Sequence, residues 1–219
     1  MIELILPPFV AVGEAFHDPV EAVLHPEEGR YVAEAVEERR REFTTARLCA
    51  HRTLARLGFP SGQPLLKDRH GAPLWPPGVI GSITHCAGYR AAAASRTPGL
   101  ALLGIDAEPA AALPPGVLET IALPAELARI RGLLSAHPGT PWDRLLFSMK
   151  ESVYKAWYPY TGQRLYFEDA DVTIDADCGA FTARLLVPAR PGSPPGPRRL
   201  EGRWLVRAGL LASAIAIPG

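Results

Sequence analysis

Three short runs of apolar and small residues dominate the middle of the chain: VIGSIT at residues 79–84, YRAAAAS at 89–95 and LALLGID at 100–106. Their length and the turn residues between them are typical of β-strands joined by tight connections. Three prolines then interrupt the chain, at positions 109, 114 and 115. We therefore expect part of a sheet here and a boundary between two structural units directly after it.

Helical patterns lie on both sides of these strands. Residues 27–57 have helical spacing, and a second helix is expected at 124–134. The segment Thr140-Pro141-Trp142-Asp143 offers an N-cap residue, a proline in the first turn and an early carboxylate. It predicts a third helix that runs to about Trp157, ahead of Pro159.

The remaining patterns predict short elements: a strand at 2–6, a loop at 67–77, and strands at 171–174, 181–186, 202–206 and 209–217. The insert at 188–199 contains five prolines and is expected to be a mobile loop. Each half of the chain thus supplies a helix followed by several strands. This predicts an α+β fold of two similar-sized lobes, residues 1–105 and 106–219, with a cleft between them.

Composition narrows the functional classes. The 23 Lys and Arg residues balance 23 Asp and Glu residues, which argues against a protein that coats nucleic acid or an anionic membrane. Only three of the cations are lysines, at positions 67, 150 and 155. The chain begins without the basic and apolar regions of a signal peptide. Three separate cysteines without a CxxC pair indicate a reducing compartment, so we expect a cytoplasmic protein.

Two carboxylates end the strand-like run at 100–106. Asp106 and Glu108 are two residues apart, so on a strand they would face the same side. Two neighbouring carboxylates repel each other unless a cation or a proton neutralises them, and Mg²⁺ prefers such oxygen ligands. The alternative is a pair of solvated acids at the end of a strand.

A third carboxylate lies on the expected helix after residue 140. Glu151 is flanked by Lys150 and followed by Lys155, so two of the three lysines lie beside one acid. This arrangement suits a third metal ligand with neighbouring ammonium groups. An exposed ion pair between Glu151 and Lys155, four residues apart, would also explain the pattern.

Polar and basic groups form two further clusters. Thr84 and His85 end a strand. This polar cluster could form an edge that faces a ligand, or His85 could be a buried, hydrogen-bonded histidine. Basic residues line the first helix and the loop after it: Arg39, Arg40, Arg41, Arg47, Arg52, Arg56, Lys67, Arg69 and His70. Such side chains suit phosphate, although a solvated basic helix face has the same pattern. Neither a P-loop nor a Rossmann glycine motif is present.

Taken together, these motifs resemble the phosphopantetheinyl transferases of the enterobactin-synthase and mycobacterial type. The stretches that carry the resemblance are RRREF from Arg39, LWPPGVIGSITHCAGYRAA from Leu74, GIDAEP from Gly104, WDRLLF from Trp142 and KESVYKAWYP from Lys150. The resemblance implies the two-lobed fold of that family. It also implies transfer of the phosphopantetheine arm of coenzyme A to a serine of an acyl or peptidyl carrier protein, with release of adenosine 3′,5′-bisphosphate.

The resemblance also assigns site residues. Its metal motif, for Mg²⁺ or Mn²⁺, falls on Asp106, Glu108 and Glu151, with Asp106, Glu151 and Lys155 as the catalytic residues. Its coenzyme-binding positions fall on Arg39, Arg47, Lys67, His70, Gly71, Thr84, His85, Asp106, Lys150 and Lys155. The sequence departs from the family at Phe147, where tryptophan is frequent, at Ser152, where alanine is usual, and at His70, where relatives often carry lysine.

The expected partners are acidic carrier domains of fatty-acid, polyketide or non-ribosomal peptide synthases, and we expect a monomer that binds neither nucleic acid nor membrane. Two other functions use the same residues. A metal-dependent hydrolase of coenzyme A or a related nucleotide would release adenosine bisphosphate without a carrier protein. A binding module for coenzyme A or a carrier protein would show no turnover.

Overall fold

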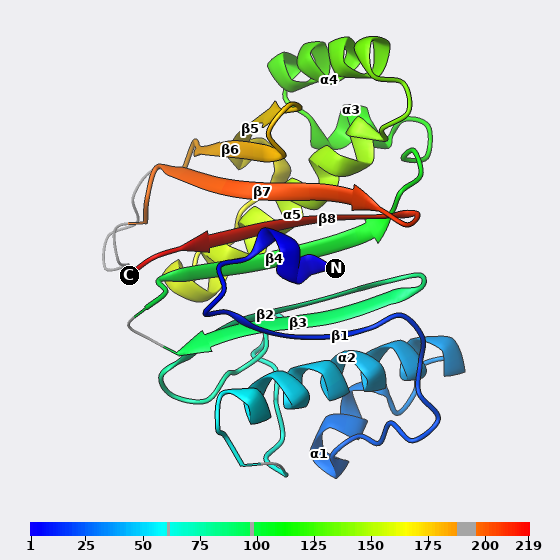
Figure 1. Cartoon of the computed structure of the whole chain (residues 1–219), viewed down its shortest axis with the longest axis vertical. Helices are drawn as coiled ribbons and strands as arrows, with labels where there is room; N and C mark the ends of the chain where they lie inside the picture. Colours follow the sequence, from blue (N-terminus) through cyan, green and yellow to red (C-terminus); the bar gives the residue numbers. More distant parts are fainter. Residues whose placement is uncertain (61, 97–98, 188–195) are drawn as a thin grey trace.

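In the computed structural model, two antiparallel sheets organise the residues that are described, 1–60, 62–96, 99–187 and 196–219 (Figure 1). The three-stranded sheet has the order β1-β3-β2 and the five-stranded sheet the order β4-β8-β7-β6-β5. In chain order the elements are η1 (Ile2–Ile5), β1 (Ala11–Ala15), α1 (Pro26–Gly29), η2 (Arg30–Val32), α2 (Glu37–Arg56), β2 (Val79–Cys86), β3 (Tyr89–Arg96), β4 (Leu102–Pro109), α3 (Val117–Ile121), α4 (Pro124–Ala136), α5 (Trp142–Thr161), η3 (Phe167–Asp169), β5 (Ala170–Asp175), β6 (Ala180–Leu185), β7 (Arg199–Arg207) and β8 (Leu210–Ile217).

The α+β architecture and most of the expected strands are confirmed. The central runs form β2, β3 and β4, and the four later runs form β5 to β8. The strand expected at 2–6 is wrong, because this segment is the 3₁₀ helix η1. Ile2 and Ile5 are its buried residues, and a spacing of three places both on one face of a 3₁₀ turn.

Two of the expected helices differ from the prediction at their ends. The helix expected at 27–57 is divided into α1, η2 and α2, with Val36 in an extended conformation before α2. Helix α5 begins at Trp142, and Thr140 does not cap it. The helix also continues through Pro159 to Thr161. A proline there removes one hydrogen bond from the last turn, and Gly162, at φ +66°, ends the helix.

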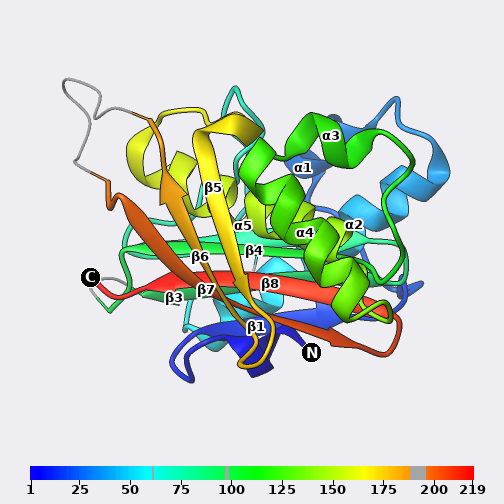
Figure 2. The ribbon, with the colours of Figure 1, turned by 90° about the horizontal axis from the view of Figure 1, so that it is seen from above.

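Helices α4 and α5 cover the five-stranded sheet, and α2 packs on the three-stranded sheet. Figure 2 shows α3, α4 and α5 on one side of the sheets and the N-terminal segment on the other. The approach of α5 to β4 is close: a side chain at Gly104 would collide with the backbone of Ser152 and Ala156. Glycine at this position therefore sets the distance between the GIDAE strand and the KESVYK helix.

The two sheets meet along β2 and β4, which pack together without a backbone ladder. Side-chain hydroxyls replace that ladder. The Ser82 Oγ accepts a hydrogen bond from the Ile105 N–H at 3.1 Å, and the Thr84 Oγ1 accepts one from the Ala107 N–H at 3.0 Å. The expected boundary at 105/106 lies inside β4, and the division into two lobes there stays a prediction.

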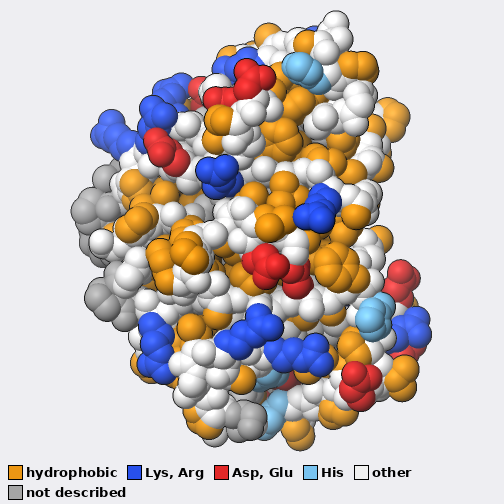
Figure 3. All heavy atoms as spheres, viewed as in Figure 1, with side chains coloured by type: hydrophobic (Ala, Val, Ile, Leu, Met, Phe, Trp, Pro, Cys, Tyr) orange, Lys and Arg blue, Asp and Glu red, His pale blue; other side chains and the backbone are white. Residues whose placement is uncertain are grey.

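Further expectations concern the proline-rich insert, membrane binding and the distribution of charge. The proline-rich insert expected to be mobile lies largely outside the described residues, since 188–195 are not among them. None of the described helices has the length and apolar composition needed to cross a membrane. Figure 3 shows acidic and basic side chains on the same face, as the balanced charge of the chain would suggest.

Candidate active site

A cavity of about 260 Å³ lies where α2, the loop after it, β2 and α5 meet. Its lining combines residues from both halves of the chain. The sequence-predicted site residues that line it are Arg39, Arg47, Lys67, His70, Gly71, His85, Glu151 and Lys155. Seven of the ten expected coenzyme-binding positions thus lie together beside the catalytic helix, whereas Thr84, Asp106 and Lys150 do not line the cavity.

Three cations gather on the α2 side of this cavity. The Arg47 side chain is buried, and its Nε and Nη2 have no hydrogen-bond partner among the described residues. Its closest carboxylate, on Glu28, lies 3.9 Å away. Burial, together with repulsion from Arg47 and Arg39, lowers the pKa of Lys67 to about 8. A buried guanidinium with free donors beside two other cations is a site for an anion.

His85 faces this cluster as a neutral ring. Burial and the neighbouring Arg39 guanidinium lower the pKa of His85 to about 4. The Arg39 Nη1 lies 3.0 Å from the His85 Nε2 and donates to it. At neutral pH, His85 therefore offers a hydrogen bond to a ligand and adds no positive charge.

The acidic side of the site is built around Asp106 on β4. Its Oδ1 accepts hydrogen bonds from the Thr84 Oγ1 at 3.2 Å and from the Lys155 Nζ at 2.6 Å. Its Oδ2 is buried and has no partner among the described residues. A buried carboxylate oxygen without a partner is costly, and a bound cation would remove that cost.

The pKa values of two further carboxylates, Glu108 and Glu151, are raised by burial and by neighbouring negative charge. Burial, followed by repulsion from Asp106, raises the pKa of Glu108, while the Arg144 Nη1 donates to Glu108 at 2.9 Å and opposes the rise. Burial also raises the pKa of Glu151, with repulsion from Asp106 and Glu108 in the same direction and Lys155 in the opposite one. The donor set and its excess negative charge fit a divalent cation.

No three His, Cys, Asp or Glu side chains of the described residues are grouped so that they could hold a metal ion. Mg²⁺ commonly uses only one or two protein carboxylates and completes its shell with water and substrate phosphate. Asp106, Glu108 and Glu151 therefore do not form a complete metal site by themselves in the described part of the chain.

Lys150, for which the resemblance implies coenzyme binding, does not line this cavity. Its ammonium is buried, forms an ion pair with Glu126 at 2.8 Å, and donates to the carbonyls of Phe167 and Ala170 at 2.6 and 2.8 Å. All three donors are therefore used inside the protein. At 100° per helical residue, Lys150 and Lys155 lie on different faces of α5, and Lys155 is the one that reaches Asp106.

Two residues of the site on α5 were not among those expected from the sequence. Arg144 pairs with Glu108, and Tyr158 lines the cavity and bonds to Asp68. Both lie seven residues from Glu151, a spacing that returns to nearly the same helix face. That heptad relation to the predicted catalytic glutamate is the signal that could have identified them.

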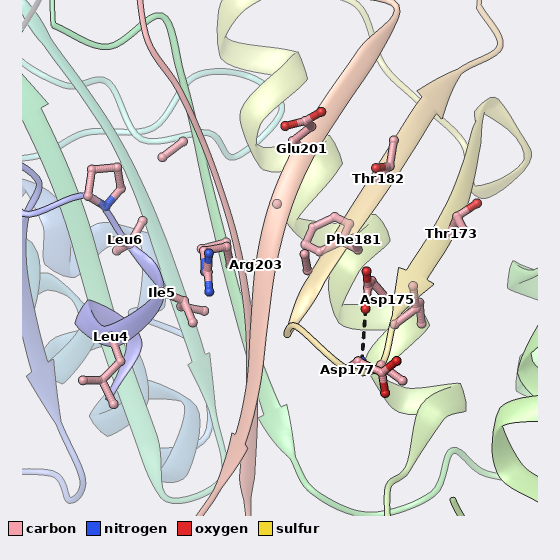
Figure 4. Close-up of a pocket in the computed structure, with 17 residues that line it drawn as sticks. Leu4, Ile5, Leu6, Thr173, Asp175, Asp177, Phe181, Thr182, Glu201 and Arg203 are labelled. Atoms are coloured by element: carbon pink, nitrogen blue, oxygen red, sulfur yellow. Dashed lines mark hydrogen bonds between the residues drawn. The ribbon is translucent and has the colours of Figure 1, made fainter. Parts of the chain in front are cut away.

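A larger hollow, of about 1110 Å³, lies elsewhere, on the face of the five-stranded sheet beside η1. Figure 4 shows its labelled side chains, which include Arg203, Glu201, Thr182 and Thr173, spread over neighbouring strands. The one hydrogen bond drawn there is local, from the Asp177 N–H to the Asp175 carboxylate at 3.0 Å. This hollow contains no residue of the expected site.

Comparisons with known proteins identify the family of the chain. The model of the 4′-phosphopantetheinyl transferase N-terminal domain matches residues 27–95, and that of the 4′-phosphopantetheinyl transferase superfamily matches 102–193. The chain is similar to the 4′-phosphopantetheinyl transferase Svp of Streptomyces mobaraensis, with 52% identity over 99% of this chain and 89% of the relative. For the transferase PptT of Mycobacterium tuberculosis the identity is 44%, over 95% and 92% of the two chains, and for Npt of Nocardia iowensis it is 44%, over 99% of both. The chain therefore belongs to the 4′-phosphopantetheinyl transferase superfamily.

Proposed function

We propose a division of labour among the cavity residues for the reaction of this superfamily. The protein is an enzyme that transfers the 4′-phosphopantetheine arm of coenzyme A to a carrier-protein serine, which converts the apo carrier to the holo form. The serine oxygen forms a new bond to the phosphorus that bears the pantetheine. The pyrophosphate P–O bond breaks, and adenosine 3′,5′-bisphosphate leaves.

The cations on the α2 side hold the phosphates of coenzyme A in this scheme. The observation that carries the assignment is the buried Arg47 guanidinium, whose Nε and Nη2 have no hydrogen-bond partner in the described part of the chain. Arg39 and Lys67 add charge at the same wall, and the neutral His85 adds a hydrogen bond. His70 and Gly71, in the loop that carries Lys67, would meet the same ligand.

Asp106, Glu108 and Glu151 would hold Mg²⁺, for which Mn²⁺ could substitute. The unpartnered Asp106 Oδ2 and the raised pKa values of both glutamates support this assignment. A bound divalent ion would supply positive charge to the pyrophosphate and its leaving oxygen. Thr84 would keep Asp106 in place through its hydrogen bond to Oδ1.

Glu151 accepts the serine proton, directly or through a water molecule. Burial raises the pKa of this carboxylate, which increases its affinity for a proton. Lys155, one turn further along α5, neutralises the charge that develops on the transferred phosphoryl group. In the absence of ligand, its ammonium is held by Asp106 at 2.6 Å.

We further propose that acyl and peptidyl carrier domains of fatty-acid, polyketide or non-ribosomal peptide synthases are the acceptors. We also propose that the enzyme acts as a monomer. The three cysteines are free thiols, and Cys49 and Cys86 are buried. Free thiols support an enzyme of the reducing cytoplasm.

Mass spectrometry of several apo carrier proteins, incubated with coenzyme A and Mg²⁺, tests the reaction. The expected result is a gain of one phosphopantetheine group on at least one carrier. Glu151→Gln should reduce the rate by about 10²–10⁴-fold, as for other general bases. It should also abolish the heat of Mg²⁺ binding in calorimetry with coenzyme A present.

Glu168→Gln is the matched control, since Glu168 is exposed and does not line the coenzyme cavity. This variant should retain both the transfer rate and the binding of Mg²⁺. Release of adenosine bisphosphate without a carrier protein would instead indicate a hydrolase. Unchanged transfer by Glu151→Gln would overturn the assignment of the base.

A further inference from the structure

A tight loop presents Lys67, His70 and Gly71 to the coenzyme cavity. Its backbone closes on itself, because the Asp68 N–H donates to the Ala72 carbonyl at 2.9 Å and the Leu74 N–H to the Leu66 carbonyl at 2.9 Å. Gly71 has a φ of +88°, which favours glycine at the tip. The loop therefore has a defined shape of its own.

The Asp68 carboxylate stabilises this loop by accepting three hydrogen bonds. Its Oδ1 accepts hydrogen bonds from the backbone N–H groups of His70, at 2.8 Å, and Ala72, at 2.9 Å. Its Oδ2 accepts a third hydrogen bond from the Tyr158 hydroxyl at 2.6 Å. Burial opposes the charged form, but these hydrogen bonds keep the pKa of Asp68 below its usual range.

The third bond joins the loop to the catalytic helix, across 90 residues of sequence. Tyr158 lies on α5 seven residues after Glu151 and lines the same cavity. Its ring stacks on Tyr154 with centroids 5.8 Å apart and meets the edge of the His70 ring at 5.6 Å. The hydrogen bond to Asp68 also raises the pKa of Tyr158 to about 12, so the hydroxyl remains a donor over the working pH range.

We propose that Tyr158 is a positioning residue, whose hydroxyl ties the Asp68 loop to α5 and so sets the affinity for coenzyme A. The proposal rests on the function proposed above, because it assumes that Lys67, His70 and Gly71 contact the coenzyme. Without the tether, the loop would keep its internal turn but lose its fixed distance from Glu151 and Lys155. Preorganisation of this kind reduces the entropy that a ligand loses on binding.

Tyr158→Phe is the sharpest test, because it removes one hydroxyl and keeps the ring that packs on Tyr154 and His70. We expect the Kd of coenzyme A, measured by calorimetry, to rise about tenfold, as for loss of a hydrogen bond to a charged group. The KM for coenzyme A should rise in parallel. The kcat at saturating coenzyme A and the KM for the carrier protein should stay at the wild-type values.

Tyr160→Phe is the matched control on the same helix. Its side chain does not line the coenzyme cavity, and its hydroxyl makes no hydrogen bond to any residue that the structure describes. Asp68→Asn should weaken coenzyme binding as well, and adding Tyr158→Phe to it should weaken binding no further. Hydrogen exchange of the His70 and Ala72 amides, which bond to Asp68 within the loop, and of the α5 amides should be unchanged in Tyr158→Phe.

Wild-type affinity for coenzyme A in Tyr158→Phe would overturn the proposal. So would a variant that loses kcat and thermal stability together while its Kd is unchanged, because that is the behaviour of a purely structural residue. Failure of the proposed function has a different signature. In that case the wild-type protein would bind coenzyme A without transfer to any carrier, and the effect of Tyr158→Phe on the Kd would remain.

Discussion

Replacement of Lys150 by methionine tests whether Lys150 on α5 serves the stability of the fold while Lys155 serves the transfer reaction. The Lys150 ammonium and the Glu126 carboxylate are both buried and lie 2.8 Å apart. Glu126 also accepts hydrogen bonds from the backbone N–H groups of Leu123 and Val172, both at 2.7 Å. Lys150→Met would therefore leave a buried carboxylate without its counter-charge, and the carbonyls of Phe167 and Ala170 without their donor.

Breaking one partner of a buried ion pair destabilises a protein by about 3–5 kcal/mol. For a chain of this size, 1 kcal/mol shifts the Tm by about 2–4 °C, so the expected loss is roughly 6–20 °C. Urea denaturation followed by circular dichroism, alongside a thermal scan, would measure it. The double variant Lys150→Met with Glu126→Gln should recover part of the loss, because it removes the uncompensated charge and keeps an acceptor.

Coenzyme binding provides the second half of this experiment. Folded Lys150→Met should bind coenzyme A with the wild-type Kd, whereas Lys155→Met should lose transfer activity with a smaller loss of stability. Lys155 makes one ion pair, to Asp106, and its side chain is 27% exposed. The reasoning would be refuted by a Lys150→Met variant that is within about 1 kcal/mol of wild type. Coenzyme binding that is weakened in the folded variant would refute it equally.

Two further predictions concern the cavity. Arg144→Met should weaken Mg²⁺ binding in the presence of coenzyme A by about 10–100-fold, because Glu108 loses the guanidinium that orients it. Calorimetric titration with Mg²⁺ measures this effect. Unchanged Mg²⁺ affinity would show that Arg144 does not orient Glu108. The pKa of Lys67 near 8 means that its ammonium is charged below pH 8 and neutral above it, so the affinity for coenzyme A should fall as the pH rises through 8. Lys67→Met should lose this pH dependence and bind as the wild type does at high pH, whereas a pH dependence that persists in this variant would place its origin elsewhere.

The central strands and the acidic cluster could be predicted because their signals are local. Apolar runs between turns indicate β2, β3 and β4, and the spacing of Asp106 and Glu108 places both on one side of β4. Strand β1 was missed, since AVGEA is short and its glycine gives no pattern of its own. Its position becomes clear only in three dimensions, where Gly13 allows the backbone of α2 at Cys49 to approach.

The relations among site residues within α5 could likewise be predicted, whereas their contacts with other elements could not. Glu151 and Lys155 are four residues apart and so share a helix face, which the sequence allows one to calculate. The family resemblance placed Lys150 among the coenzyme-binding positions beside Glu151, although helical geometry turns it away from Lys155. Its true partner, Glu126, is on another helix. No spacing within α5 could indicate that pairing, and the same holds for Tyr158 and Asp68.

The hydroxyl of Thr84 has a consequence for how the enzyme responds to its substrates. It accepts from the Ala107 N–H, which helps to join the two sheets, and donates to Asp106, which is proposed to hold the metal. In an enzyme that binds its ligands at Asp106, association of the sheets and substrate binding are thermodynamically linked, so each strengthens the other by the same free energy. Separation of the two sheets then costs the least free energy in the ligand-free enzyme. Saturation with substrate raises that cost and so stabilises the enzyme against unfolding by this route.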